Sequence, residues 1–118
     1  MTAIGTDLTT NFDNFVVRLN AIGAVATADQ ITSSGVALTF TSGAVVEANN
    51  IFNIIALSTA SNTATGILLN AGTTLSQILK NNITGVRQPN TGGWSAYGIN
   101  VSTTTSTDGI LFANNTIS

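Results

Sequence analysis

Carboxylates are the side chains of this sequence that could act as general acids, general bases or calcium ligands. Glycoside hydrolases hold two carboxyl groups roughly 5–10 Å apart across the scissile bond. The 118-residue sequence has no His and no Cys, which excludes Ser–His pairs, thiol nucleophiles, disulfides and most zinc sites. Acid–base or metal chemistry would therefore depend on five acids: Asp7, Asp13, Asp29, Glu47 and Asp108.

Whether these acids can meet depends on the fold, and two markers indicate an internal repeat. One marker is a pair of asparagines after an apolar stretch: Asn49-Asn50, Asn81-Asn82 and Asn114-Asn115. The other is a glycine that opens an apolar segment: Gly35, Gly66 and Gly98. Both markers recur with spacings of 31 to 33 residues, and two markers in phase predict repeated structural units.

Each repeat is interpreted as three short strands joined by polar turns. The apolar segments are rich in β-branched residues, while the helix formers Glu, Lys and Gln are scarce. The sequence therefore predicts an all-β fold, a parallel β-helix (β-solenoid) of about three coils. Its expected parts are a cap or lead-in at residues 1–13, repeats at 14–49, 50–81 and 82–114, and a truncated last coil at 115–118.

Residues 12–22 allow two interpretations. Phe12, Phe15, Val16 and Leu19 follow the i, i+3, i+4, i+7 spacing of an amphipathic helix, which would form a short N-terminal capping helix. The same residues can equally form a strand. The sequence leaves both alternatives open.

The recurring asparagines predict a ladder of stacked side chains. Equivalent residues of neighbouring coils lie about 4.8 Å apart, so their amides can hydrogen-bond along the stack. Asn also tolerates the left-handed backbone conformation that a tight turn between two strands needs. We expect Asn50, Asn82 and Asn115 to form this ladder.

The segments GILLNAGTT, ILKNNITGV and SAYGINVSTTTSTDGILFANNTIS resemble the right-handed parallel β-helix proteins of the pectate-lyase-like superfamily. The likeness covers residues 35–118 and is greatest to the Asn/Thr-rich repeats of large secreted bacterial surface proteins. It implies a right-handed solenoid. It also implies that an enzyme of this kind would cluster several carboxylates around Ca²⁺ together with a basic residue.

The five acids do not fall at equivalent positions of the repeat. Asp29 lies six residues before Gly35, whereas Asp108 lies ten after Gly98. Glu47 aligns with Leu79 and Phe112, which are apolar. The sequence therefore predicts no enzyme, no metal site and no cofactor. Glu47 itself is explained by a one-residue slip that turns Val46 or Val45 inward, or else by a costly buried carboxylate.

The variable loop at residues 85–97 is the candidate binding segment. It contains the only Trp, Tyr and Pro of the chain. Trp94 and Tyr97 could offer flat faces to sugar rings, with polar contacts from Arg87 and Asn90. The alternative is that Trp94 folds back to cover the flank of its coil and the loop is inert.

Composition limits the partners. Only 7% of the residues are charged and three are basic, which argues against nucleic acid. No apolar run approaches the roughly 18 residues of a membrane span, so no membrane insertion is expected. A polarity supplied by Thr, Ser and Asn is typical of secreted and cell-surface β proteins, although no signal peptide is visible in this chain.

The sequence stops in the middle of a repeat, at Asn-Asn-Thr-Ile-Ser. We expect either that the chain belongs to a longer solenoid or that residues 1–20 of a neighbouring copy complete its last coil. The predicted function is a structural or adhesive module that can assemble end to end into a filament. The alternative is a carbohydrate-binding module or phage tail-type domain using residues 85–97, and the missing His, Cys and aligned acids argue against a polysaccharide lyase or hydrolase.

Overall fold

The computed structural model describes residues 1–4, 12–57, 62–89, 92–102 and 109–118. These residues form fourteen short strands and one 3₁₀ turn, η1 (Thr27–Asp29). Every pair of neighbouring strands is parallel. The expectation of an all-β chain with parallel strand pairing is confirmed.

The strands belong to four sheets, named A to D. Sheet A has the order β1 (Thr2–Ile4), β5 (Ser34–Thr39), β9 (Ala64–Asn70) and β12 (Ala96–Ser102). Sheet B pairs β2 (Phe12–Asp13) with β6 (Thr41–Ser42). Sheet C has the order β3 (Val16–Arg18), β7 (Val45–Glu47), β10 (Gln77–Leu79) and β13 (Leu111–Ala113). Sheet D has the order β4 (Ala21–Gly23), β8 (Asn50–Phe52), β11 (Asn82–Thr84) and β14 (Thr116–Ile117).

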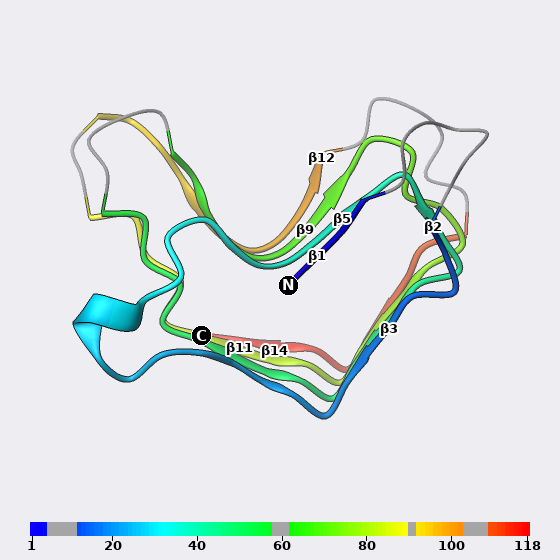
Figure 1. Cartoon of the computed structure of the whole chain (residues 1–118), viewed down its shortest axis with the longest axis horizontal. Helices are drawn as coiled ribbons and strands as arrows, with labels where there is room; N and C mark the ends of the chain where they lie inside the picture. The colour runs from blue at the N-terminus through cyan, green and yellow to red at the C-terminus, as the bar shows by residue number, and fades with distance from the viewer. Residues whose placement is uncertain (5–11, 58–61, 90–91, 103–108) are drawn as a thin grey trace.

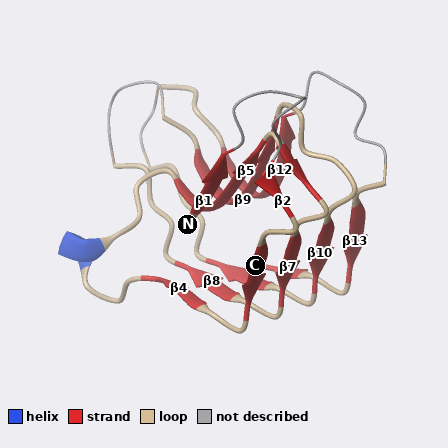
Figure 2. Ribbon diagram, turned by 45° about the vertical axis from the view of Figure 1, so that its right-hand side comes forward, coloured by secondary structure: helices blue, strands red, loops and turns tan. Residues whose placement is uncertain are grey.

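The chain passes through sheets A, C and D in the same order four times, and each passage lies beside the previous one (Figure 1). We call these passages the first layer (β1–β4), the second (β5–β8), the third (β9–β11) and the fourth (β12–β14). Figure 2 shows the resulting rows of parallel strands. Residues 12–22 contribute β2, β3 and β4, so the strand alternative is correct and the capping helix is wrong.

Columns of aliphatic side chains fill the space between the sheets. In sheet C, Val17, Val46 and Ile78 are in register and buried. Other columns follow the same rule, with Ile22, Ile51 and Ile83 in sheet D, Val36 and Ile67 in sheet A, and Leu38 and Leu69 beside them. Each such side chain contributes about 1.5–3 kcal/mol through removal from water. The in-register columns therefore supply the main stabilisation of the stack.

Glu47 is at the outer surface, because Val46 takes the inward position of β7. Val46 turns inward as expected and the buried-carboxylate alternative is wrong, but no one-residue slip against β10 is present. Glu47 does pair with Leu79, which is also an outward position. The alignment with Phe112 is wrong by one residue, because Leu79 pairs with Ala113.

The repeated glycines Gly35, Gly66 and Gly98 lie in β5, β9 and β12 of sheet A, and a Cβ on each of them would closely approach an isoleucine of sheet D. A Cβ on Gly35 would stand 2.7 Å from Ile51 Cγ2, and one on Gly66 would stand 2.5 Å from Ile83 Cγ2. The Gly66 Cβ would also meet the carbonyl oxygen of Gly98 at 2.5 Å. Glycine is required here because any side chain would hold the two sheets apart.

Gly66→Ala should lower the free energy of unfolding by about 1–3 kcal/mol, because the new methyl group meets a backbone carbonyl and a buried isoleucine that cannot move away. Gly98→Ala is the matched control. The three atoms nearest to its methyl group all belong to the side chain of Ile117, which is 55% exposed at the end of the stack and therefore has room to shift. Urea denaturation of both variants checks the difference, and equal losses would contradict the close-approach explanation.

Candidate functional site

Four asparagines form a hydrogen-bonded ladder at the corner between sheets C and D. They are Asn20, Asn49, Asn81 and Asn115, one from each layer. The side-chain amide of each donates to Oδ1 of the next, over 3.2, 3.0 and 3.0 Å in chain order. The backbone N–H of the same donor reaches the same oxygen, over 3.0, 3.1 and 3.0 Å. Each Oδ1 inside the stack thus accepts two hydrogen bonds.

The ladder amides also bind the backbone of the layer before them. Nδ2 of Asn49 donates to the carbonyl of Val17, and Nδ2 of Asn81 donates to that of Val46, both over 2.9 Å. Asn115 repeats the contact with Ile78 over 2.7 Å. Asn49 and Asn81 are fully buried with all their polar atoms paired, which is the condition under which a buried amide stabilises a fold.

The predicted hydrogen bond between Asn50 and Asn82 is present, but the buried ladder runs through the residues before them, Asn49 and Asn81. Asn50 and Asn82 belong to β8 and β11, point outward and share a single exposed hydrogen bond of 3.0 Å. Asn115 is placed correctly. The third asparagine pair is offset from the others, because Thr116 and not Asn115 is in register with Asn82.

The cause given for the ladder is also wrong. The left-handed residue at each corner is the one before the ladder asparagine: Leu19, Ala48, Lys80 and Asn114, with φ of 57°, 54°, 54° and 55°. Only one of these is an asparagine. Non-glycine residues in this conformation cost about 1–3 kcal/mol each, so the surrounding contacts must hold the turn in place. The saturated amide that follows supplies such contacts.

The fourth layer leaves the inward-facing side chains of β13 and β14 exposed. Phe112 stands above Ile78 in its column and is 42% exposed, whereas Ile78 is 0% exposed. Ile117 is 55% exposed above Ile83, which is 0% exposed. A hollow of about 440 Å³ opens at this end. Its lining residues are Ile99, Val101, Phe112, Ala113, Asn114 and Asn115.

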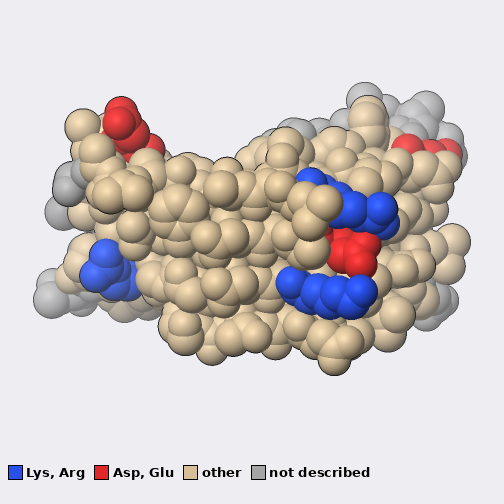
Figure 3. Space-filling view, turned by 90° about the horizontal axis from the view of Figure 1, so that it is seen from below, with Lys and Arg blue, Asp and Glu red and all other residues tan. Residues whose placement is uncertain are grey.

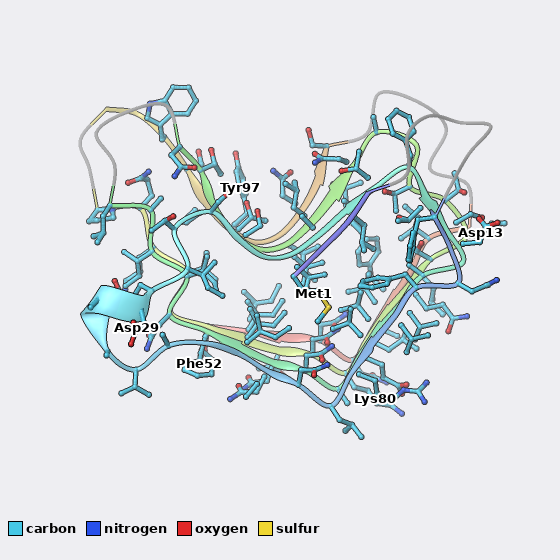
Figure 4. All side chains as sticks on the ribbon, viewed as in Figure 1. Met1, Asp13, Asp29, Phe52, Lys80 and Tyr97 are labelled. Atoms are coloured by element: carbon cyan, nitrogen blue, oxygen red, sulfur yellow. The ribbon has the colours of Figure 1, made fainter. Side chains whose placement is uncertain are left out.

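The first layer differs, because its core is covered. Val17 and Ile22, the first-layer members of the same two columns, are only 1% and 9% exposed. Phe15 packs against this end of the core, and Met1 lies between the sheets in Figure 4. The two ends of the stack are therefore distinct surfaces: at the first layer the core is covered and Met1 is half exposed, and at the fourth layer a hollow opens beside Ile99.

Glu47 joins two cations on the outer face of sheet C. Its carboxylate lies 2.8 Å from a guanidinium nitrogen of Arg18 and 3.3 Å from Nζ of Lys80. Figure 3 shows this red group between two blue ones. Arg18 and Lys80 are more than half exposed, so each pair stabilises by no more than about 1 kcal/mol. The three charges fit a surface ion-pair stack between layers.

The predicted glycan-binding residues lie in or before β12. Arg87 is held by a backbone bridge to Ile55, and its side chain is exposed. Trp94 and Tyr97 are also exposed, and Tyr97 lies near the bend of sheet A in Figure 4. Within the described residues no hydrogen bond or ion pair joins these three side chains to one another. Asn90 lies outside the described residues, so the proposed glycan site stays a prediction.

Two of the five acids, Asp7 and Asp108, lie outside the described residues. Across the described ranges no three His, Cys, Asp or Glu side chains gather as metal ligands. No described helix has the length and apolarity needed to cross a membrane. Comparison with family models, with curated proteins and with solved structures finds no match for this chain. Its resemblance to the pectate-lyase-like superfamily therefore stays a prediction.

Asn81→Leu should lower the free energy of unfolding by about 3 kcal/mol, because it leaves the buried N–H groups of Asn49 without their acceptor. Asn82→Leu is the matched control, since it makes the same change one residue later and removes one exposed hydrogen bond. It should cost less than about 1 kcal/mol. Thermal and urea denaturation measure both, and a larger loss for Asn82→Leu would restore the ladder predicted from sequence.

Proposed function

We propose that this chain is a structural β-solenoid module that assembles end to end through its fourth layer. The four in-register layers are the coils of the solenoid. The observation that carries the proposal is the loss of burial along the core columns of sheets C and D: Ile78 and Ile83 of the third layer are 0% exposed, whereas Phe112 and Ile117 of the fourth are 42% and 55% exposed. A surface of core residues in register is complementary to another layer of the same kind.

The strands of the fourth layer support the proposal. Strands β12, β13 and β14 contain no Lys, Arg, Asp, Glu or Pro. Natural edge strands that must not pair are protected by charges, prolines or bulges. An edge without charge or proline, next to an open core, is suited to accept a further parallel strand in each sheet.

The setting of the module is part of the same proposal. The sparse charge and the abundance of Thr, Ser and Asn favour a secreted or cell-surface protein with a structural or adhesive role. The solenoid's partner is then either another copy or further solenoid. No catalytic step is proposed, because the acids show no common register in the sequence.

The Ile117→Lys variant tests assembly through the fourth layer. The wild-type chain should show a mass that rises with concentration in light scattering. Ile117→Lys should remain at the mass of one chain, because it places a charge on the open core column. Leu57→Lys is the matched control: Leu57 is 54% exposed, like Ile117 at 55%, but lies in the connection between β8 and β9, away from the fourth layer in the chain. A wild-type chain that stays single at every concentration would refute the proposal.

A second candidate function is glycan binding at residues 85–97, and the exposure of Trp94 and Tyr97 favours it. Both residues are more than 40% exposed, so part of each side chain is open to a ligand. Exposed aromatic rings on a rigid sheet are suited to stack on sugar rings.

The single Trp of the chain makes this candidate easy to test. A stacked sugar should change Trp94 fluorescence in a saturable way during titration with dextran or with polygalacturonate. Tyr97→Ala should weaken that change at least about tenfold, which corresponds to about 1.4 kcal/mol. Fluorescence that does not respond to either polysaccharide would remove these two glycans as ligands.

A further inference from the structure

We propose that the partner of the fourth layer is the first layer of a second copy of this chain, stacked head to tail through the asparagine ladder. This inference rests on the proposed end-to-end assembly and adds its partner and its polarity. The observation behind it is that the ladder has a direction. Every amide donates toward the following layer, so the two ends of the ladder carry opposite hydrogen-bonding groups.

The C-terminal end of the ladder has hydrogen-bond donors with no following layer to accept from them. Asn49 and Asn81 each use the backbone N–H and a side-chain N–H to bind the next layer. Asn115 has the same two donors, but among the described residues its side-chain amide donates only to the carbonyl of Ile78, and its backbone N–H has no acceptor there. A partner must therefore present an acceptor at this corner.

The N-terminal end of the ladder has the matching acceptor. Oδ1 of Asn49 and Oδ1 of Asn81 each accept two hydrogen bonds from the layer before them. Oδ1 of Asn20 receives no donor from the described residues, and Asn20 is exposed. Two donors at one end of the chain and one doubly accepting oxygen at the other would complete the ladder between copies.

A second contact continues in the same direction. The carbonyls of Val17, Val46 and Ile78 each accept from the ladder amide of the following layer. The next carbonyl in this column is that of Phe112. In the single chain, Nδ2 of Asn20 donates to the carbonyl of Arg18 in its own layer, over 2.9 Å. In a stacked copy it could donate to Phe112 instead, as its counterparts do.

The shapes of the two ends agree with this polarity. The fourth layer is hollow beside Ile99, and Met1 precedes β1 in the column that leads through Val36 and Ile67 to Ile99. The Met1 side chain is half exposed at the opposite end of the stack. Continued in register, Met1 of one copy would fill the hollow of the other. A tail-to-tail pair would instead place the donors of Asn115 against one another.

Variants that block either the first or the fourth layer test the head-to-tail polarity of the stack. Ile117→Lys blocks the fourth layer. Asn20→Lys blocks the first, because an ammonium group replaces the acceptor that the donors of Asn115 require. Asn50→Lys is its matched control: it introduces the same charge and also removes one Asn–Asn side-chain hydrogen bond, an exposed one between the second and third layers. Circular dichroism checks that all three variants are folded, and light scattering then measures their masses alone and mixed.

Head-to-tail stacking has a distinct outcome. Each blocked variant alone should have the mass of one chain. An equal mixture of the two should form dimers that contain one chain of each variant. The mass of Asn50→Lys should rise with concentration, as that of the wild type does. Dimers of Asn20→Lys alone would show a tail-to-tail contact and overturn the inference while leaving the proposed assembly intact. A wild-type chain that does not associate would overturn both.

Cross-linking gives a second measurement that does not depend on blocked ends. The chain has no Cys, so Leu19→Cys and Asn114→Cys each introduce one thiol. These residues occupy the same corner position of the first and fourth layers. Stacked strands place equivalent Cα atoms about 4.8 Å apart, within the range of a disulfide. Mild oxidation should link the mixed variants to each other at least about tenfold more than either to itself. Preferential self-linking of Asn114→Cys would overturn the inference.

Discussion

Parallel stacking in register requires every layer to turn the same corner at the same place, and the asparagine ladder meets this requirement. From Val17 to Ile22 is five residues, and the corresponding core residues are five apart in the other three layers as well. Each corner contains a left-handed residue that is not glycine. A side-chain amide that saturates the neighbouring backbone fixes this turn relative to the layer before it. The core columns of sheets C and D can remain aligned only if this turn has the same place in every layer.

The sequence was sufficient to predict the period, the strands and the parallel pairing, because β-branched segments and polar turns recur with the spacing of the layers. It was also sufficient to find the glycine column, although not its cause. The contact that excludes a side chain from Gly66 is made with Ile83 and Gly98, and such a contact exists only after the layers stack. Sequence spacing alone cannot show which sheet approaches which.

The ladder shows where prediction from the sequence stops. Neighbouring asparagines such as Asn49 and Asn50 have the same chemistry, and only the backbone conformation decides which one turns inward. The left-handed residue is leucine, alanine or lysine in three of the four corners, types that carry no turn signal. The first layer was missed for a related reason: its ladder residue, Asn20, has no asparagine beside it and precedes Asn49 by 29 residues and not by 32.

The layers are 29, 32 and 34 residues apart along the chain, measured from Val17 through Val46 and Ile78 to Phe112. Because the corner is constant, all of this difference falls in the connections that lead from sheet D to sheet A and from sheet A to sheet C. The differences in the length of those connections leave the five-residue corner between sheets C and D unchanged. The connections from sheet D to sheet A and from sheet A to sheet C can therefore change in length and in the surface they present during evolution, while the corner that aligns the layers stays the same.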